Sequence, residues 1–231
     1  MNDYIFGTQE PLINKKKLRI PQYEAYYKIR KYYEKNKNDR EISVILPVGC
    51  GKSGLITLIP FAVKSHRTLV VAPNVKISGQ LYNDFDMSNP DMFYIKCSVL
   101  DDSVPFPEAV EIRGTKANKS DLDNADVVIT NIQQLQGEDN RWLNFLPSNY
   151  FDLIIFDEAH HNVANSWVNL RENFPNAKIV NLSATPTRAD GQVMSGKIIY
   201  SYSVCQAIKE GYVKRLKALV LNPKTLKFVR E

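Results

Sequence analysis

The segment ISVILPVGCGKSGLITLIPFAV, residues 42–63, restricts the possible folds more than any other part of the sequence. Its first half is a run of β-branched and aliphatic residues that predicts a buried strand ending at Pro47. Its second half is again apolar and predicts a helix. Between the two lies a short turn with two glycines, followed by Lys52 and Ser53. A strand, a glycine-rich turn and a helix in this order are typical of a phosphate-binding loop.

The turn has the residue types that phosphate binding requires. Glycines let backbone N–H groups point at an anion because no Cβ blocks the approach, and the start of a helix adds partial positive charge. We expect Lys52 to reach the β- and γ-phosphates of a nucleotide and Ser53 to bind Mg²⁺. The match is to the short G-x-G-K-S core, and an ordinary turn is the alternative. The other residues expected to surround the phosphates are Pro47, Gly49, Cys50 and Gly51.

The rest of the chain alternates between short apolar segments and segments with helical spacing. Strands are predicted at residues 67–73, 92–97, 125–130, 151–158, 177–186 and 216–221. Helices are predicted at residues 21–37, 75–85, 167–174 and 204–210, whereas residues 98–124 are polar and irregular. Apolar strands separated by helices predict an α/β fold of the P-loop NTPase class, with a mostly parallel sheet covered on both faces. We divide the chain into a helical lead-in, residues 1–40, and an ATP-binding domain, residues 41–231.

The composition favours a globular protein of a reducing compartment. The 231 residues carry a net charge of +5, which permits an anionic partner without requiring one. Cys50, Cys97 and Cys205 are far apart and form no C-x-x-C pair, so we expect a cytoplasmic chain without a zinc site. We find no signal peptide and no apolar segment long enough to span a bilayer, and therefore expect no membrane partner.

A second motif, LIIFDEAHH at residues 153–161, ends an apolar strand with two acidic residues. Nucleotide hydrolysis needs a carboxylate for the metal and a group that positions the attacking water. We expect Asp157 to hold Mg²⁺ through water and Glu158 to orient or deprotonate the nucleophile, with a solvated acidic loop as the alternative. His160 is expected to act as a polar relay from the γ-phosphate, because two adjacent histidines without further ligands make a poor zinc site.

Together, these motifs resemble those of the superfamily 2 DEAD/DEAH-box helicases and translocases. PVGCGKS is similar to their motif I, DEAH to motif II, and LSATPTRADG at residues 182–191 to motif III with a T-P-x-R-x-D-G extension. The extension and DEAHH are similar to the branch that contains the motor subunits of type I and type III restriction enzymes. The segments LRIPQ, VVAPNVKISGQL, VVITNIQQL and YSYSVCQAIKEGYV resemble further elements of this branch.

The resemblance implies a first RecA-like domain that binds ATP and Mg²⁺ and moves along nucleic acid, in which Gln22 reads the adenine edge. Four residues match positions that touch the sugar–phosphate backbone, although turn and cap residues are the alternative. These residues are Pro73, Asn74, Thr130 and Asn131. A further set matches the element that couples the nucleotide state to strand binding. It comprises Ser183, Ala184, Thr185 and, in the extension, Arg188 with Asp190, for which an internal salt bridge is the alternative.

The lead-in also carries a cluster of tyrosines, and its role is open at this point. The cluster consists of Tyr23, Tyr26, Tyr27, Tyr32 and Tyr33. Helical spacing favours core packing together with a shell over the adenine. Stacking on nucleic-acid bases is the alternative.

The leading hypothesis is therefore the first motor domain of an ATP-driven DNA helicase or translocase. The sequence has no counterpart of motifs IV to VI, so we expect a second RecA-like domain to complete the motor, in cis or in trans. Without its arginines, turnover should be slow. An RNA-remodelling ATPase, a nucleic-acid-binding module without turnover and a small-molecule kinase are the alternatives. The T-P-x-R-x-D-G extension favours DNA, and the presence of both Lys52 and Glu158 disfavours a module without turnover.

Overall fold

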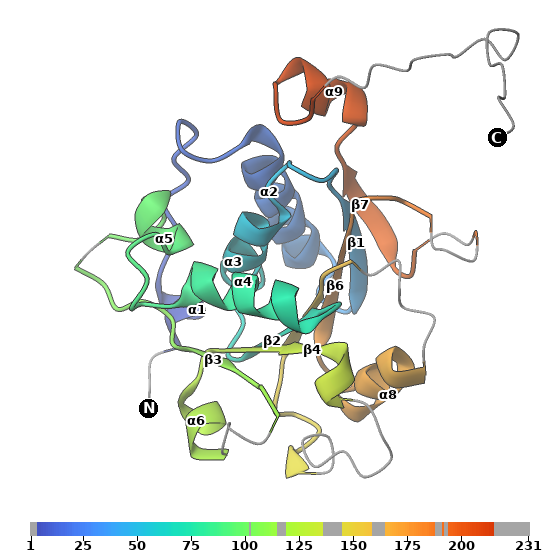
Figure 1. Cartoon of the computed structure of the whole chain (residues 1–231). Coiled ribbons are helices and arrows are strands. Elements are labelled where there is room, and N and C mark those ends of the chain that lie inside the picture. The colour runs from blue at the N-terminus through green and yellow to red at the C-terminus, as the bar shows by residue number, and fades with distance from the viewer. Residues whose placement is uncertain are drawn as a thin grey trace, which may run out of the picture.

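The computed structural model describes residues 4–101, 103–114, 119–135, 145–158, 165–187, 191 and 194–214. In this part of the chain, seven strands form one sheet in the order β3-β4-β2-β5-β6-β1-β7, and every neighbouring pair is parallel (Figure 1). The strands are β1 Glu41–Ile45, β2 Thr68–Ala72, β3 Ala109–Glu111, β4 Val127–Asn131, β5 Leu153–Phe156, β6 Lys178–Ser183 and β7 Lys197–Ser201. The predicted parallel α/β fold is thus confirmed.

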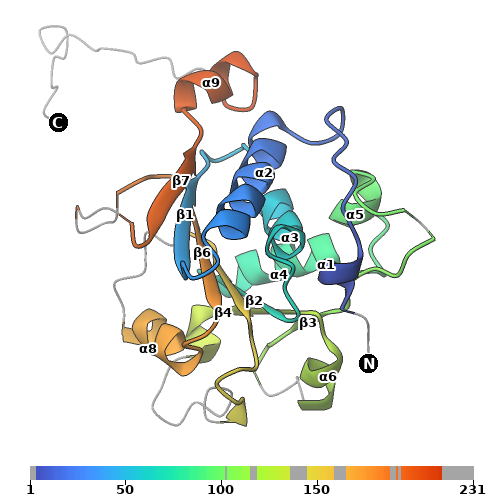
Figure 2. The ribbon, with the colours of Figure 1, turned by 180° about the vertical axis from the view of Figure 1, so that it is seen from behind.

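Helices cover both faces of the sheet (Figure 1, Figure 2). One face carries α1 Ile5–Thr8, α2 Ile20–Lys35, α3 Lys52–Val63, α4 Val75–Phe85 and α5 Phe93–Lys96. The other carries α6 Lys119–Asn124, η1 Ile132–Leu135 and α8 Asn165–Asn173, while α9 Val204–Lys209 follows β7. Helix α2, which belongs to the predicted lead-in, packs in the same core cluster as α3. The boundary at residue 40 between the lead-in and the ATP-binding domain stays a prediction.

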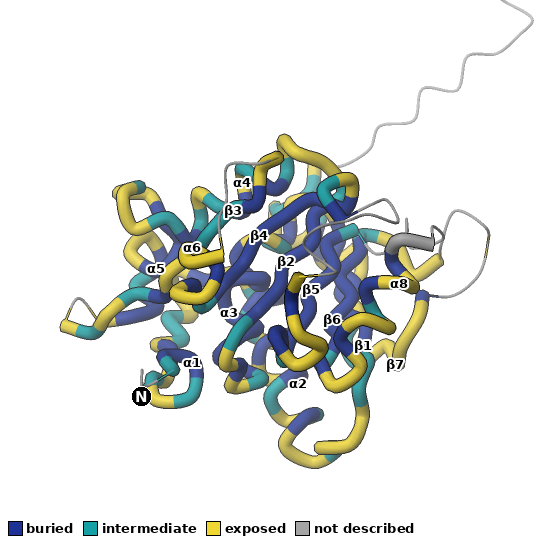
Figure 3. Tube along the Cα trace, turned by 90° about the horizontal axis from the view of Figure 1, so that it is seen from below, coloured by how far each residue is buried: buried dark blue, intermediate teal, exposed yellow. Residues whose placement is uncertain are grey.

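The apolar strands are explained by burial on both faces. In β5, Leu153 and Ile155 pack into the cluster under α2 and α3, whereas Ile154 and Phe156 pack into the cluster under α8. Figure 3 shows the same pattern along the central strands, which are buried over nearly their whole length. A strand with apolar neighbours above and below has no polar face, which is why its residues do not alternate.

The prediction of a strand at residues 92–97 is wrong, because this segment contains the one-turn helix α5. Met92 and Tyr94 are fully buried, and the Tyr94 hydroxyl donates a hydrogen bond to the Thr57 carbonyl of α3 at 3.0 Å. A short apolar run is compatible with either structure, and here packing against α3 selects a helical turn. The edge strand β3 comes instead from the region predicted to be irregular, and the strand predicted at 216–221 lies outside the described residues.

Among the described helices, none combines the length and apolar character needed to cross a membrane. The cysteines in the same part of the chain are unpaired: Cys50 and Cys97 are buried and Cys205 is exposed.

Asp84 on α4 gives the fold a pH-dependent stability. Burial raises the pKa of this carboxyl to about 6, although Lys96 opposes the shift. The folded chain therefore keeps a proton that the unfolded chain has released, and the stability contributed by Asp84 is lost as pH rises from about 4 to 6. We expect Asp84→Asn to raise the free energy of unfolding at pH 7 by about 1–2 kcal/mol.

Urea unfolding at pH 4 and pH 7 measures this effect. Asp84→Asn should be more stable than the unmodified chain at pH 7, and the two should have similar stability at pH 4. Asp91→Asn is a matched control, because Asp91 is an exposed aspartate of the following turn. The explanation fails if Asp84→Asn is no more stable than Asp91→Asn at pH 7.

Candidate nucleotide-binding site

The motif segments meet at the carboxyl edge of the sheet. Strands β1 and β6 are neighbours, and the Leu46 N–H donates to the Ser183 carbonyl at 2.9 Å just beyond β1. Strand β5 lies on the other side of β6, and the Asp157 N–H that follows it donates to the Val71 carbonyl at 3.0 Å. Because all these strands are parallel, their carboxyl ends open onto one crevice, where ligands of such sheets bind.

The loop between β1 and α3 has the geometry of an anion cradle. Gly49 and Gly51 both have φ of +87°, in the left-handed region that favours glycine. A Cβ on Gly49 would lie 2.7 Å from the Tyr212 carbonyl oxygen, and one on Gly51 would lie 2.5 Å from Nε2 of Gln22. No side chain caps the start of α3, so its first N–H groups are available to a phosphate. Cys50 is buried within the loop.

Lys52 meets both acids of the second motif. Its ammonium forms an ion pair with Glu158 and lies 3.9 Å from Oδ1 of Asp157. Burial lowers the pKa of Lys52, and the negative charge of Asp157 opposes this shift. Burial raises the pKa of Asp157, and the positive charge of Lys52 opposes that shift. Glu158 has a φ of +54°, which is uncommon for a residue other than glycine and marks a strained backbone at the end of this strand.

The donor set also fits a magnesium ion. Ser53 is exposed in the first turn of α3, and Asp157 Oδ1 is buried without a hydrogen-bond partner among the described residues. Mg²⁺ prefers such oxygen ligands and takes few of them from the protein, completing its octahedron with water and phosphate. The described residues contain no cluster of three or more His, Cys, Asp or Glu that could hold a metal.

Gln22 ties helix α2 to the phosphate loop. Its Nε2 donates to the Gly51 carbonyl at 2.9 Å, and its Oε1 accepts from the Arg19 N–H at 2.8 Å. Both ends of the carboxamide therefore have partners in this conformation, and the reading of adenine by Gln22 stays a prediction.

Tyr212, which was not among the predicted site residues, contacts the phosphate loop at Gly49. The Arg19 guanidinium lies 5.3 Å from the centroid of the Tyr212 ring, and the Ile20 N–H donates to the Tyr212 hydroxyl at 3.3 Å. Its carbonyl oxygen is the atom that a Cβ on Gly49 would meet. Tyr212 lies in the segment YSYSVCQAIKEGYV, which resembles an element of this branch, but the linear pattern does not indicate that this segment contacts the phosphate loop.

The four residues matched to nucleic-acid contacts separate into two pairs. Asn74 is exposed and caps α4, its Oδ1 accepting from the Ile77 N–H at 3.0 Å, and the neighbouring Pro73 is half-buried. Thr130 and Asn131, at the carboxyl end of β4, are completely buried. In this conformation, their side chains are closed to a ligand, and the Asn131 amide has no hydrogen-bond partner in the described part of the chain.

The residues matched to coupling lie next to the phosphate loop. Ser183 is buried at the end of β6 and its Oγ accepts from the Thr185 N–H at 3.2 Å, with Ala184 between them. Thr185 is exposed. The other predicted site residues, His160, Arg188 and Asp190, lie outside the described residues.

Comparison with known protein families shows to which family the chain belongs. Residues 15–188, more than half of the sequence, match the family model described as type III restriction enzyme, res subunit (ResIII). The chain belongs to the ResIII family. This confirms the resemblance inferred from the motifs. The ResIII chain is also 28% identical over 212 residues to "Putative mitochondrial ATP-dependent helicase irc3" of Schizosaccharomyces pombe, covering 88% of this chain and 32% of the relative.

Solved structures share the fold of this ResIII chain. A nuclease-deletion mutant of the Type ISP restriction-modification enzyme LlaGI, in complex with a DNA substrate mimic, superposes with a TM-score of 0.57 at 18% identity, over 85% of this chain and 21% of that protein. The UvsW helicase from bacteriophage T4 superposes with a TM-score of 0.55 at 20% identity, over 84% and 64% of the two chains. The predicted RecA-like fold is thereby confirmed. The chain spans about a third or less of the curated relatives it matches.

Proposed function

We propose that this ResIII chain is the first, ATP-binding motor domain of a nucleic-acid-dependent ATPase, a DNA helicase or translocase that a second RecA-like domain completes. One observation carries the proposal. Lys52 and Glu158 are 106 positions apart in the sequence, yet their side chains pair beside an uncapped helix start and two glycines with positive φ. A glycine-rich loop, a lysine and an acidic residue at the same edge of a sheet are the groups that nucleotide hydrolysis requires.

Each component has a separate task in this proposal. The N–H groups at the start of α3 bind the phosphates, and Lys52 leaves Glu158 to neutralise the terminal phosphate. Glu158 then orients or deprotonates the attacking water. Ser53 and Asp157 would hold Mg²⁺, which offsets phosphate charge when it is bound. We assign Ser183, Ala184 and Thr185, at the end of β6 beside the phosphate loop, to passing a change at the phosphates to a bound strand.

The proposed partner is DNA, with RNA as the second candidate. The T-P-x-R-x-D-G sequence favours DNA, and the solved LlaGI relative was bound to a DNA mimic. In this proposal, the exposed Asn74 at the start of α4 binds a backbone phosphate without reading bases.

ATP turnover measured without nucleic acid and with single-stranded DNA, duplex DNA or RNA tests the proposal. We expect ATP to bind, basal turnover to be slow and DNA to stimulate it more than RNA of the same length. Preferential stimulation by RNA would identify an RNA-remodelling enzyme. Failure to bind ATP would overturn the proposed function, and strong unwinding by this chain alone would remove the need for a second domain.

A further inference from the structure

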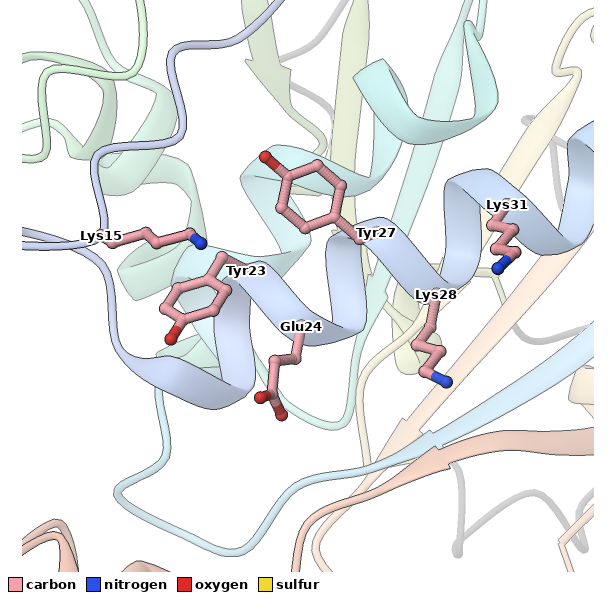
Figure 4. Close-up of a pocket in the computed structure, with 6 residues that line it drawn as sticks. All are labelled: Lys15, Tyr23, Glu24, Tyr27, Lys28 and Lys31. Atoms are coloured by element: carbon pink, nitrogen blue, oxygen red, sulfur yellow. The ribbon is translucent and has the colours of Figure 1, made fainter.

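The tyrosines of the lead-in cluster differ in burial, and Tyr32 is partly buried against the core. Tyr26 and Tyr33 are buried in the core beneath α2. In contrast, Tyr23 and Tyr27 project from the outer side of α2 and line a groove of about 430 Å³, and the Tyr27 residue is 47% exposed (Figure 4). The groove is lined by Lys15, Tyr23, Glu24, Tyr27, Lys28 and Lys31. Tyr23 is partly buried against the core, so core packing, one part of the role favoured from sequence, leaves mainly the exposed Tyr27 unexplained. The shell over the adenine stays a prediction.

The groove is positively charged. Lys28 and Lys31 are exposed, and the Lys15 ammonium lies 5.4 Å from the centroid of the Tyr23 ring. The one carboxylate, that of Glu24, accepts a hydrogen bond from the Tyr200 hydroxyl of β7 at 2.7 Å. Within the described residues, no salt bridge involves any of the three lysines. Their charges are thus available to an anion.

The spacing of rings and cations suits an extended polyanion that carries flat groups. Tyr23, Tyr27 and Lys31 follow one another at four-residue intervals along one side of α2. Eight residues of helix span about 12 Å, which is the rise of about three stacked nucleotides in one strand. Exposed aromatic rings with neighbouring lysines bind single strands through base stacking and phosphate contacts. An acidic protein would pair with the lysines but would leave the rings without a role.

We propose that the outer face of α2 binds single-stranded nucleic acid, with phosphates on Lys28 and Lys31 and a base stacked on Tyr27. This site is separate from the ATP site, because Gln22, on the inner side of the same helix, contacts the phosphate loop. The inference rests on the proposed function only for the choice of nucleic acid as the anion, since the groove itself supplies the charge and the rings.

Fluorescence anisotropy of labelled oligothymidylate, without ATP and over a series of salt concentrations, tests the lysines. The groove variant is Lys28→Gln with Lys31→Gln. The matched control is Lys35→Gln with Lys37→Gln, which removes the same charge from exposed positions outside the groove. We expect the slope of log affinity against log salt concentration to be less negative by about 1.4 in the groove variant, because two phosphate contacts are lost. Equal slopes and affinities in the two variants would overturn the proposal.

Tyr27 separates stacking from charge. Tyr27→Ala should lower affinity about fivefold or more without changing the salt slope, and Tyr27→Phe should restore it. Unchanged affinity in Tyr27→Ala, or competition by polyglutamate as strong as by unlabelled oligonucleotide, would count against a nucleic-acid site. Binding of a fluorescent ATP analogue is measured in parallel and should be unaffected in every groove variant. If the unmodified chain does not bind the ATP analogue, the proposed function is refuted, but the result for the groove remains valid.

Discussion

Lys52→Ala is expected to abolish ATP binding at concentrations that saturate the unmodified chain. The Lys52 ammonium lies beside the loop and meets Asp157 and Glu158, the two acids that follow β5. No neutral side chain can replace its charge-assisted bonds to phosphate. We expect the dissociation constant to rise at least about 100-fold, equivalent to about 2.7 kcal/mol. Equilibrium titration with a fluorescent ATP analogue measures the change.

The same substitution leaves the carboxylates of Asp157 and Glu158 partly buried without their cation, so folding has to be measured separately. Urea unfolding shows whether the variant is folded at the temperature of the titration. Lys35→Ala is the matched control, because Lys35 is exposed at the end of α2. Folded Lys52→Ala that binds ATP as tightly as Lys35→Ala would remove Lys52 from the proposed site.

Glu158→Gln is expected to separate ATP binding from hydrolysis. The amide keeps the shape of the side chain but can neither accept a proton from water nor pair with Lys52 as an ion. We therefore expect hydrolysis to fall by about 10²–10⁴-fold. ATP should bind at least as tightly as before, because Lys52 no longer has to leave a carboxylate. Single-turnover hydrolysis in the presence of DNA, together with the titration described above, measures both effects.

A matched control for this variant is Glu172→Gln on α8, which changes an exposed glutamate. It should hydrolyse ATP at the rate of the unmodified chain. If Glu158→Gln hydrolyses ATP equally fast, Glu158 is not the group that activates water.

The strands that carry the site could be predicted because each is buried on both faces. β1, β2, β5 and β6 have few polar residues, and this apolar character is visible in the sequence. The edge strands differ, since β3 is only three residues long and half-buried and β7 is mostly exposed. Their residues are mixed in character, so hydrophobic periodicity gives no signal for them.

The site was predictable to the extent that its residues are adjacent in sequence. The phosphate loop and the acidic pair each lie within a few positions, and parallel topology implies that they share an edge. The ion pair of Lys52 with Glu158, the use of both ends of the Gln22 carboxamide and the position of Tyr212 depend on side-chain packing between distant segments. A linear pattern carries no information about such packing.

The position of β1 sets the time at which the nucleotide site can form during synthesis. Both neighbours of β1 in the sheet, β6 and β7, come late in the chain, and Tyr212 comes later still. Pairing between such distant segments has a high entropic cost of loop closure and slows folding. A nascent chain that has left the ribosome only as far as α8 therefore holds the phosphate-loop sequence without the structure that shapes it. ATP capture should then mark the completion of this sheet.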